Sequence, residues 1–179
     1  RGSRWWSPHH HAASACAGDR PVDAITRAEP PRVFGGCLTP PAYQRGDAEL
    51  AVAATILGGG KSSRLYKSLV YERQIAQDVS STQTSLALGS TFVVDVTARA
   101  GHTPQELEAA IDAELERLRK DGPSEREVER ARNSLETALL ASLEKLGGDG
   151  LAEQLNHYNL YTGDPGYLAK DLARLRAID

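Results

Sequence analysis

Apolar residues recur every three or four positions through most of the second half of the chain, which is the spacing of one helix face. One apolar stripe follows Thr103–Glu106 and a second follows Ser124–Glu127, and both segments match the capping box that begins helices. A further helix is predicted over Leu151–Tyr161, and Asp164 with Pro165 predicts the start of a last one. The two stripes consist of Leu107, Ile111, Leu115 and Leu118, and of Val128, Ala131, Leu135, Leu139, Leu143 and Leu146.

The first half of the chain contains strand patterns as well as helix patterns. Alternation in its last strand places Phe92, Val94, Val96 and Ala98 on one face, so this strand and the one before it predict a hairpin with one face toward a core. Strands early and helices late indicate an α+β fold, an antiparallel sheet with helices packed on one face. The predicted strands are Arg32–Leu38, Ile75–Leu86 and Thr91–Ala98, and the predicted helices of this half are Asp47–Leu57 and Ser63–Arg73.

In residues 1–31 the apolar residues show neither helical spacing nor strand alternation. We predict that this segment is a disordered tail, or an artefact of expression or of the reading frame, and that the domain spans residues 32–179. A run of three histidines, His9 to His11, could hold a metal ion. In an unpatterned terminus, an expression remnant or a solvated tail explains such a run equally simply, and we favour that interpretation.

Composition is that of one ordinary globular domain. The 179 residues are 40% hydrophobic and 25% charged, and a chain of this length buries roughly 70% of its unfolded surface. The net charge of −3 indicates neither a nucleic-acid nor a membrane partner. Cys16 and Cys37 lack metal-type or redox-type spacing. The chain begins at Arg and contains no Met, so we expect it to be a piece of a longer protein.

A glycine-rich break separates the two helices predicted in the first half. Gly60, Lys61 and Ser62 match the end of a phosphate-binding loop, but that loop needs a strand leading in and a glycine five residues before Gly60, where Thr55 stands. The alternative is a helix-to-helix corner in which Ser62 or Ser63 caps the second helix. The helical pattern before the glycines favours the corner.

The segment from Leu57 to Val79 reads Leu-Gly-Gly-Gly-Lys-Ser-Ser-Arg-Leu-Tyr-Lys-Ser-Leu-Val-Tyr-Glu-Arg-Gln-Ile-Ala-Gln-Asp-Val. It resembles a signature of the second, non-metal-binding domain of the insulinase/pitrilysin, processing-peptidase-like zinc metallopeptidases, Leu-Gly-Gly-Gly-x-Ser-Ser-Arg-Leu-(Tyr/Phe)-x-x-(Leu/Val)-Arg-Glu-x-x-Gly-Leu-Ala-Tyr. From Arg32 to Asp179 the order of elements resembles the middle and end of that domain, which in the family forms part of a half-shell around a chamber. The matching scaffold positions are Gly58, Gly59, Gly60, Ser62, Ser63, Arg64 and Tyr66.

The resemblance fails at the two positions that act on substrate. In relatives an Arg and a Tyr of this signature hold the substrate backbone and stabilise the oxyanion. They align with Val70 and Gln77, and valine donates no hydrogen bond. We therefore expect no catalytic residue here, and only weak substrate contact at those two positions. Arg64 and Tyr66 are expected to tie down the glycine-rich corner, with substrate contact as the alternative.

The zinc motif of the family, H-x-x-E-H, is absent from the chain. His102 precedes a predicted helix start, while Glu153 and His157 are one helical turn apart and fit a solvated polar pair better than a metal site. The resemblance implies that zinc belongs to a neighbouring domain outside this chain.

The resemblance thus implies a non-catalytic supporting domain, lining the chamber of a bacterial-type zinc metallopeptidase that degrades peptides. Its partners would be the zinc-bearing domain or subunit and the peptide substrate, with no nucleic acid and no membrane. The alternative is a structural, catalytically inactive core or partner subunit of the same family. By resemblance alone, the expected compartment is periplasmic or secreted.

Overall fold

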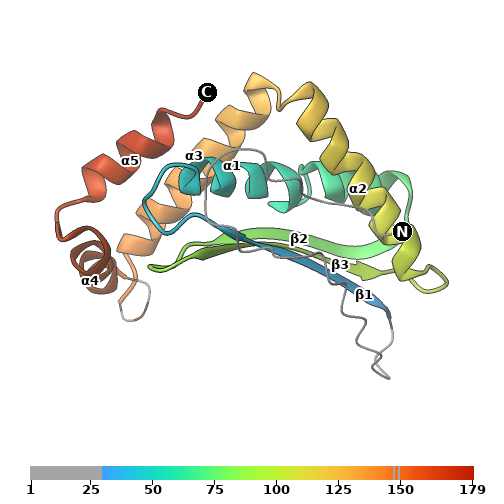
Figure 1. Cartoon of the computed structure of the whole chain (residues 1–179), viewed down its shortest axis with the longest axis horizontal. Helices are drawn as coiled ribbons and strands as arrows, with labels where there is room; N and C mark the ends of the chain where they lie inside the picture. The colour runs from blue at the N-terminus through green and yellow to red at the C-terminus, as the bar shows by residue number, and fades with distance from the viewer. Residues whose placement is uncertain (1–29, 147, 149) are drawn as a thin grey trace.

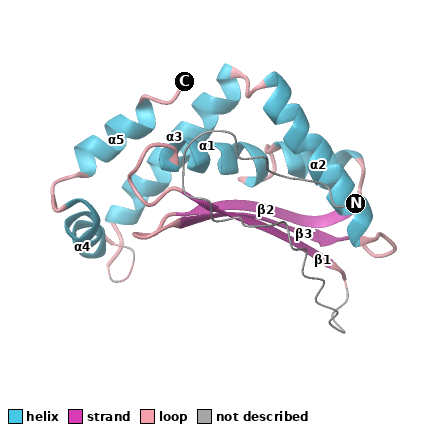
Figure 2. Cartoon of the chain, in the orientation of Figure 1, coloured by secondary structure: helices cyan, strands magenta, loops and turns pink. Residues whose placement is uncertain are grey.

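A computed structural model describes residues 30–146, 148 and 150–179. It has two layers, with helices on one side of a three-stranded antiparallel sheet (Figures 1 and 2). The α+β class predicted from the sequence is confirmed, whereas the prediction for residues 1–31 lies almost entirely outside the described residues. The elements are β1 (Arg32–Thr39), α1 (Asp47–Gly58), the π-helix η1 (Tyr66–Glu72), β2 (Ala76–Thr84), β3 (Ser90–Ala98), α2 (Pro104–Asp121), α3 (Glu125–Leu143), α4 (Leu151–Thr162) and α5 (Leu168–Arg176).

The sheet has the order β1–β3–β2, so β3 is central and the predicted β2–β3 hairpin is confirmed. Val94 and Val96 of β3 are completely buried beneath the helices, while Asp95 between them points to the opposite face and pairs across the sheet with Phe34. No described helix covers that opposite face, which Figure 1 shows below the helical layer. We call it the open face.

Two apolar clusters hold the layers together. The main cluster joins the sheet to η1 and α2, and its fully buried members include Leu65, Leu69 and Ile111. Burying each such side chain stabilises the fold by about 1.5–3 kcal/mol. A smaller cluster joins α1, α3 and α5. It consists of Val52, Ile56, Val128, Ala131 and Leu175, with Leu135 and Ile178 packed against it.

Helix starts follow the sequence pattern only in part. Thr103 accepts the backbone N–H of Glu106 at 3.3 Å, but the Glu106 carboxylate binds His102 Nδ1 at 2.9 Å, so this capping box is only half formed. The second box, at Ser124, is complete. The last helix begins at Leu168, later than predicted, because residues 164–167 form a turn closed by the Asp164 backbone and carboxylate oxygens.

Every helix in the described part of the chain is too short or too polar to cross a bilayer.

Candidate functional site

Gly58 lets the end of α1 approach β2, and the two glycines that follow it turn the chain out of the helix. A Cβ on Gly58 would lie 2.4 Å from the backbone nitrogen of Ser81, and one on Gly59 would lie 2.5 Å from the carbonyl oxygen of Thr55. Gly60 has φ +104°, in the left-handed region that favours glycine. A helix, not a strand, leads into these glycines, so the lead-in of a phosphate-binding loop is missing.

Of the two serines predicted as caps, Ser63 directly precedes the next helix, and its carbonyl oxygen accepts the Lys67 N–H at 3.1 Å. Ser63 is buried, and its hydroxyl donates to the carbonyl oxygen of Gly60 at 2.6 Å, which the Ser63 N–H also reaches at 3.0 Å. The Ser63 hydroxyl therefore acts here as a donor that closes the turn. Ser62 is exposed. Residues 58–63 therefore form a tight corner, called here the glycine corner.

Arg64 fastens the glycine corner to the turn between α2 and α3. Its Nε and Nη2 donate to the two carboxylate oxygens of Glu127 at 2.8 and 2.7 Å, and Nη2 also donates to the carbonyl oxygen of Gly122 at 3.0 Å. Solvent reaches only 17% and 20% of the Arg64 and Glu127 side chains. The Arg64 hydrogen bonds, joined by those from Ser124, lower the pKa of Glu127 to about 2.

The helix predicted over Ser63–Arg73 is present over residues 64–72, and most of it is the π-helix η1. Its last turn has π-type spacing, in which the Arg73 N–H donates to the carbonyl oxygen of Ser68 at 2.9 Å. Tyr66 is half-buried at its first position. π-type turns often occur at functional sites in helices, and this one lies inside the segment that carries the family signature.

The two positions that align with the relatives' Arg and Tyr lie in different environments. Val70 is half-buried on η1 and packs against the main core cluster. Gln77 is exposed at the start of β2, where the pairing with β3 shifts between Ala76 and Asp78 and leaves Gln77 in a bulge. A bulge redirects a side chain locally. The only functional group at this pair of positions is thus the neutral amide of Gln77.

Gln74, between η1 and β2, has φ +55° although it is not a glycine. It aligns with the Gly of the family signature, a departure that comparison of the two patterns could have revealed. Its amide oxygen accepts a hydrogen bond from Arg99 at 3.3 Å.

The residues present do not fit a zinc site in the part of the chain that the structure describes, where no group of three or more His, Cys, Asp and Glu side chains could hold a metal ion. His157 Nε2 lies 4.0 Å from Glu153 Oε1, with nearly half of each side chain exposed. His9 to His11 lie outside the described residues.

A second polar cluster, which was not predicted from the sequence, holds α5 to the rest of the domain. Asp47, almost fully buried, accepts the Tyr43 N–H at 2.9 Å and Arg174 Nη1 at 3.1 Å. Arg174 Nη2 donates to Asp171 at 2.8 Å, and Asp171 accepts the Tyr158 hydroxyl at 3.0 Å. Burial, with Asp171 nearby, raises the pKa of Tyr43 to about 12 and also raises that of Tyr158. Asp47 and Arg174 alone are 127 residues apart, so local spacing does not reveal the cluster.

Known structures share this fold. A protease from Helicobacter pylori superposes with a TM-score of 0.71 at 22% identity, over 83% of this chain and 35% of that one. A peptidase M16 inactive domain from Pseudomonas fluorescens gives 0.67 at 20% identity, over 83% and 34%. This chain thus spans about a third of both proteins. The inactive peptidase domain of a candidate zinc protease from Bordetella parapertussis gives 0.69 at 22% identity, over 87% and 84%. At these identities the likeness shows the fold alone.

Comparison with curated protein sequences finds no significant match. The family description "Peptidase M16 inactive domain" matches residues 17–135, which is more than half of the chain and includes the whole glycine corner, η1 and the hairpin. The chain therefore belongs to the family of peptidase M16 inactive domains.

Proposed function

We propose that this domain supports a zinc-bearing peptidase domain without taking part in the chemistry. Membership of the M16 inactive-domain family supports the proposal, as does the description of a structural relative as the inactive domain of a candidate zinc protease. Zinc-dependent hydrolysis needs three protein ligands and an activated water. The described residues offer no such ligand set.

The observation that carries the proposal furthest is the open face of the sheet. Phe34 and Leu38 are 70% and 54% exposed there, although they lie on a regular strand of the sheet. Around them the open face carries little charge, because its other side chains are largely Ser and Thr. Arg32 pairs with Asp95, and Asp78 is a further carboxylate on this face. A broad face with exposed apolar side chains and no dominant charge suits a chamber wall that contacts many different peptides.

In this proposal Val70 and Gln77 contribute no transition-state contact. Val70 has no polar atom in its side chain, and the exposed amide of Gln77 carries no charge. The oxyanion would have to be stabilised by another domain. This domain would act by enclosing peptides and by supporting its zinc-bearing neighbour.

Reconstitution tests the proposal. The H-x-x-E-H domain read from the flanking coding sequence would be purified alone and mixed with this chain, and both complex formation and peptide turnover would be measured. We expect a complex with far higher turnover than the zinc domain alone. Phe34→Glu on the open face should change turnover without unfolding the chain. Leu155→Glu, at an exposed position of α4, should leave turnover unchanged. A complete gene without H-x-x-E-H would contradict the proposal and favour the structural subunit.

A further inference from the structure

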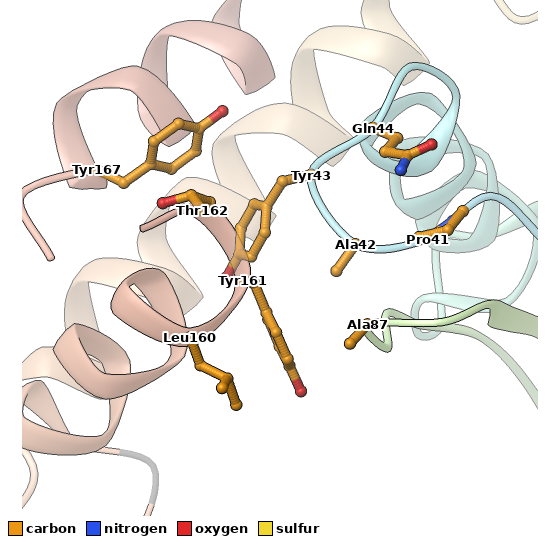
Figure 3. Close-up of a pocket in the computed structure, with 9 residues that line it drawn as sticks. All are labelled: Pro41, Ala42, Tyr43, Gln44, Ala87, Leu160, Tyr161, Thr162 and Tyr167. Carbon is orange, nitrogen blue, oxygen red and sulfur yellow. The ribbon is translucent and has the colours of Figure 1, made fainter. Parts of the chain in front are cut away.

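A pocket of about 430 Å³ opens where the loop before α1 meets the end of α4 and the residue before α5. Figure 3 shows the rings of Tyr43, Tyr161 and Tyr167 around it, with Leu160 and Ala87 at its sides. The Tyr43 ring centre lies 6.2 Å from that of Tyr161 and 5.5 Å from that of Tyr167. We call this the tyrosine pocket, and its volume is within the range of small-ligand sites.

The central ring of the pocket is held by a backbone that tyrosine rarely adopts. Tyr43 has φ +63°, a left-handed conformation that is uncommon for bulky residues. The hydrogen bond from its N–H to Asp47 maintains this conformation, and the Arg174 guanidinium lies 5.1 Å from its ring centre. The buried polar cluster therefore fixes one wall of the pocket before any ligand arrives.

The tyrosines of the pocket differ from the tyrosine behind them. Tyr158 is fully buried, and its hydroxyl donates to Asp171. Tyr161 and Tyr167 are half-buried, and their hydroxyls form no hydrogen bond to any residue that the structure describes. Packing alone would be served equally well by phenylalanine rings, so it does not account for these two hydroxyls. Partly exposed tyrosine rings supply rigid amphipathic contact surface, which antibody paratopes use to bind their antigens.

Charge restricts what the pocket can accept. Of the described residues that line it, none is charged. At its rim, Lys170 Nζ lies 5.7 Å from the Tyr167 ring centre, which disfavours a second cation over that ring. Lys170 is already paired with Asp164 at 2.8 Å, so it offers little to an anion. Leu160, 69% exposed, adds apolar surface. These features favour a neutral, ring-bearing ligand.

We propose that the tyrosine pocket binds one neutral aromatic side chain of an extended peptide, with the Tyr161 and Tyr167 hydroxyls donating to the carbonyl oxygens beside that side chain. The proposal deepens the proposed function, on which it rests for the supply of peptide. Peptides enclosed beside this domain would then be retained according to their aromatic content, by a site separate from the glycine corner.

Titration of the isolated full chain tests the pocket. Amide chemical shifts would be followed while adding Ac-Gly-Gly-Trp-Gly-Gly-NH2, or the same peptide with Ala or Lys in place of Trp. We expect the Trp peptide to bind roughly tenfold or more tightly than the Ala peptide, since burying a large ring contributes at least that factor. The Lys peptide should bind no better than Ala. Shifts should concentrate at residues 41–44 and 160–167.

Variants separate binding from packing. Tyr161→Ala should weaken Trp-peptide binding by roughly fivefold or more because the ring no longer contacts the ligand, and Tyr161→Phe, which keeps the packing, should weaken it less. Leu155 of α4 is not among the residues that line the pocket, so Leu155→Ala should leave binding unchanged. Equal affinity for Trp and Ala peptides, or shifts mapping elsewhere, would mean that the tyrosines only pack α4 and α5. Because the zinc domain is absent from this assay, its outcome is independent of reconstitution.

Discussion

Arg64 and Glu127 are 63 positions apart and form a two-pronged ion pair, with both N–O distances below 2.9 Å. The arginine lies in the family signature, whereas Glu127 is the residue that completes the capping box of α3 at Ser124. One carboxylate therefore both begins a helix and anchors the glycine corner. The pair ties the signature segment to the helical layer. A substitution at either residue should therefore destabilise both the glycine corner and the start of α3.

Arg64→Lys should destabilise the domain by about 1–2 kcal/mol, because lysine cannot bridge both Glu127 oxygens and the Gly122 carbonyl oxygen together. The pKa of Glu127 is lowered from 4.5 to about 2. A lowered carboxyl pKa stabilises the folded state fully above about pH 4.5, and that stabilisation is lost as pH falls toward 2. The difference between the wild type and the variant in urea unfolding should therefore shrink over this window.

The control for that experiment is Arg119→Lys. Arg119 pairs with Glu116 at 2.8 Å, but both side chains are more than 60% exposed, and such surface pairs contribute little. Its unfolding midpoint should match the wild type. A loss of stability in Arg119→Lys equal to that in Arg64→Lys would show that the two-pronged geometry has no special role.

Gly58→Ala should destabilise the domain by about 2–4 kcal/mol, at the upper end for overpacking. The added Cβ would lie 2.4 Å from the Ser81 nitrogen and 2.7 Å from the Ser80 carbonyl carbon, and both are backbone atoms that cannot rotate away. Gly89→Ala is the matched control, because its Cβ would meet nothing within 4 Å. Chemical denaturation of both variants gives the comparison. Similar midpoints for both would contradict the close approach of α1 and β2.

Gln74→Gly should stabilise the domain by about 0.5–1 kcal/mol. The left-handed backbone at Gln74 is strained for a side-chain-bearing residue, and relief of that strain exceeds the entropic disadvantage of glycine. The substitution removes only one hydrogen bond, from Arg99, and that bond is long at 3.3 Å. Gln105→Gly, at an exposed position within α2, should instead destabilise by a similar amount. Opposite shifts in thermal midpoint are expected, and destabilisation by both would show that φ at position 74 carries no strain.

Regular elements were readable from the sequence because their signals are local. The stripe through Leu107 and Ile111 predicts α2, and alternation through Val94 and Val96 predicts the central strand, since each pattern repeats within one element. The glycine corner was likewise predicted as a helix-to-helix break. Its backbone requirements lie in the glycines themselves.

The sequence did not reveal contacts for which two neighbouring partners compete, or contacts that join residues far apart in the chain. Glu106 binds His102 instead of completing its capping box, a choice between two partners of similar strength that spacing does not decide. The cluster of Asp47 and Arg174 assembles only when α5 returns to the start of α1. The tyrosine pocket likewise needs three segments to meet before any of its residues becomes distinctive.

Substitutions at Val70 and at Gln77 in the full-length protein should have different effects. Val70→Ala should act through stability, costing about 1–2 kcal/mol because Val70 packs against the main core cluster. Gln77→Ala should change the turnover rate little, because this exposed amide has no transition-state role in our proposal. Losing a transition-state hydrogen bond would instead lower the rate roughly a hundredfold or more. The measurement is peptide turnover by both variants at matched folded fraction. A large fall for Gln77→Ala with unchanged stability would show that this domain reaches the reacting peptide, and would overturn the supporting role.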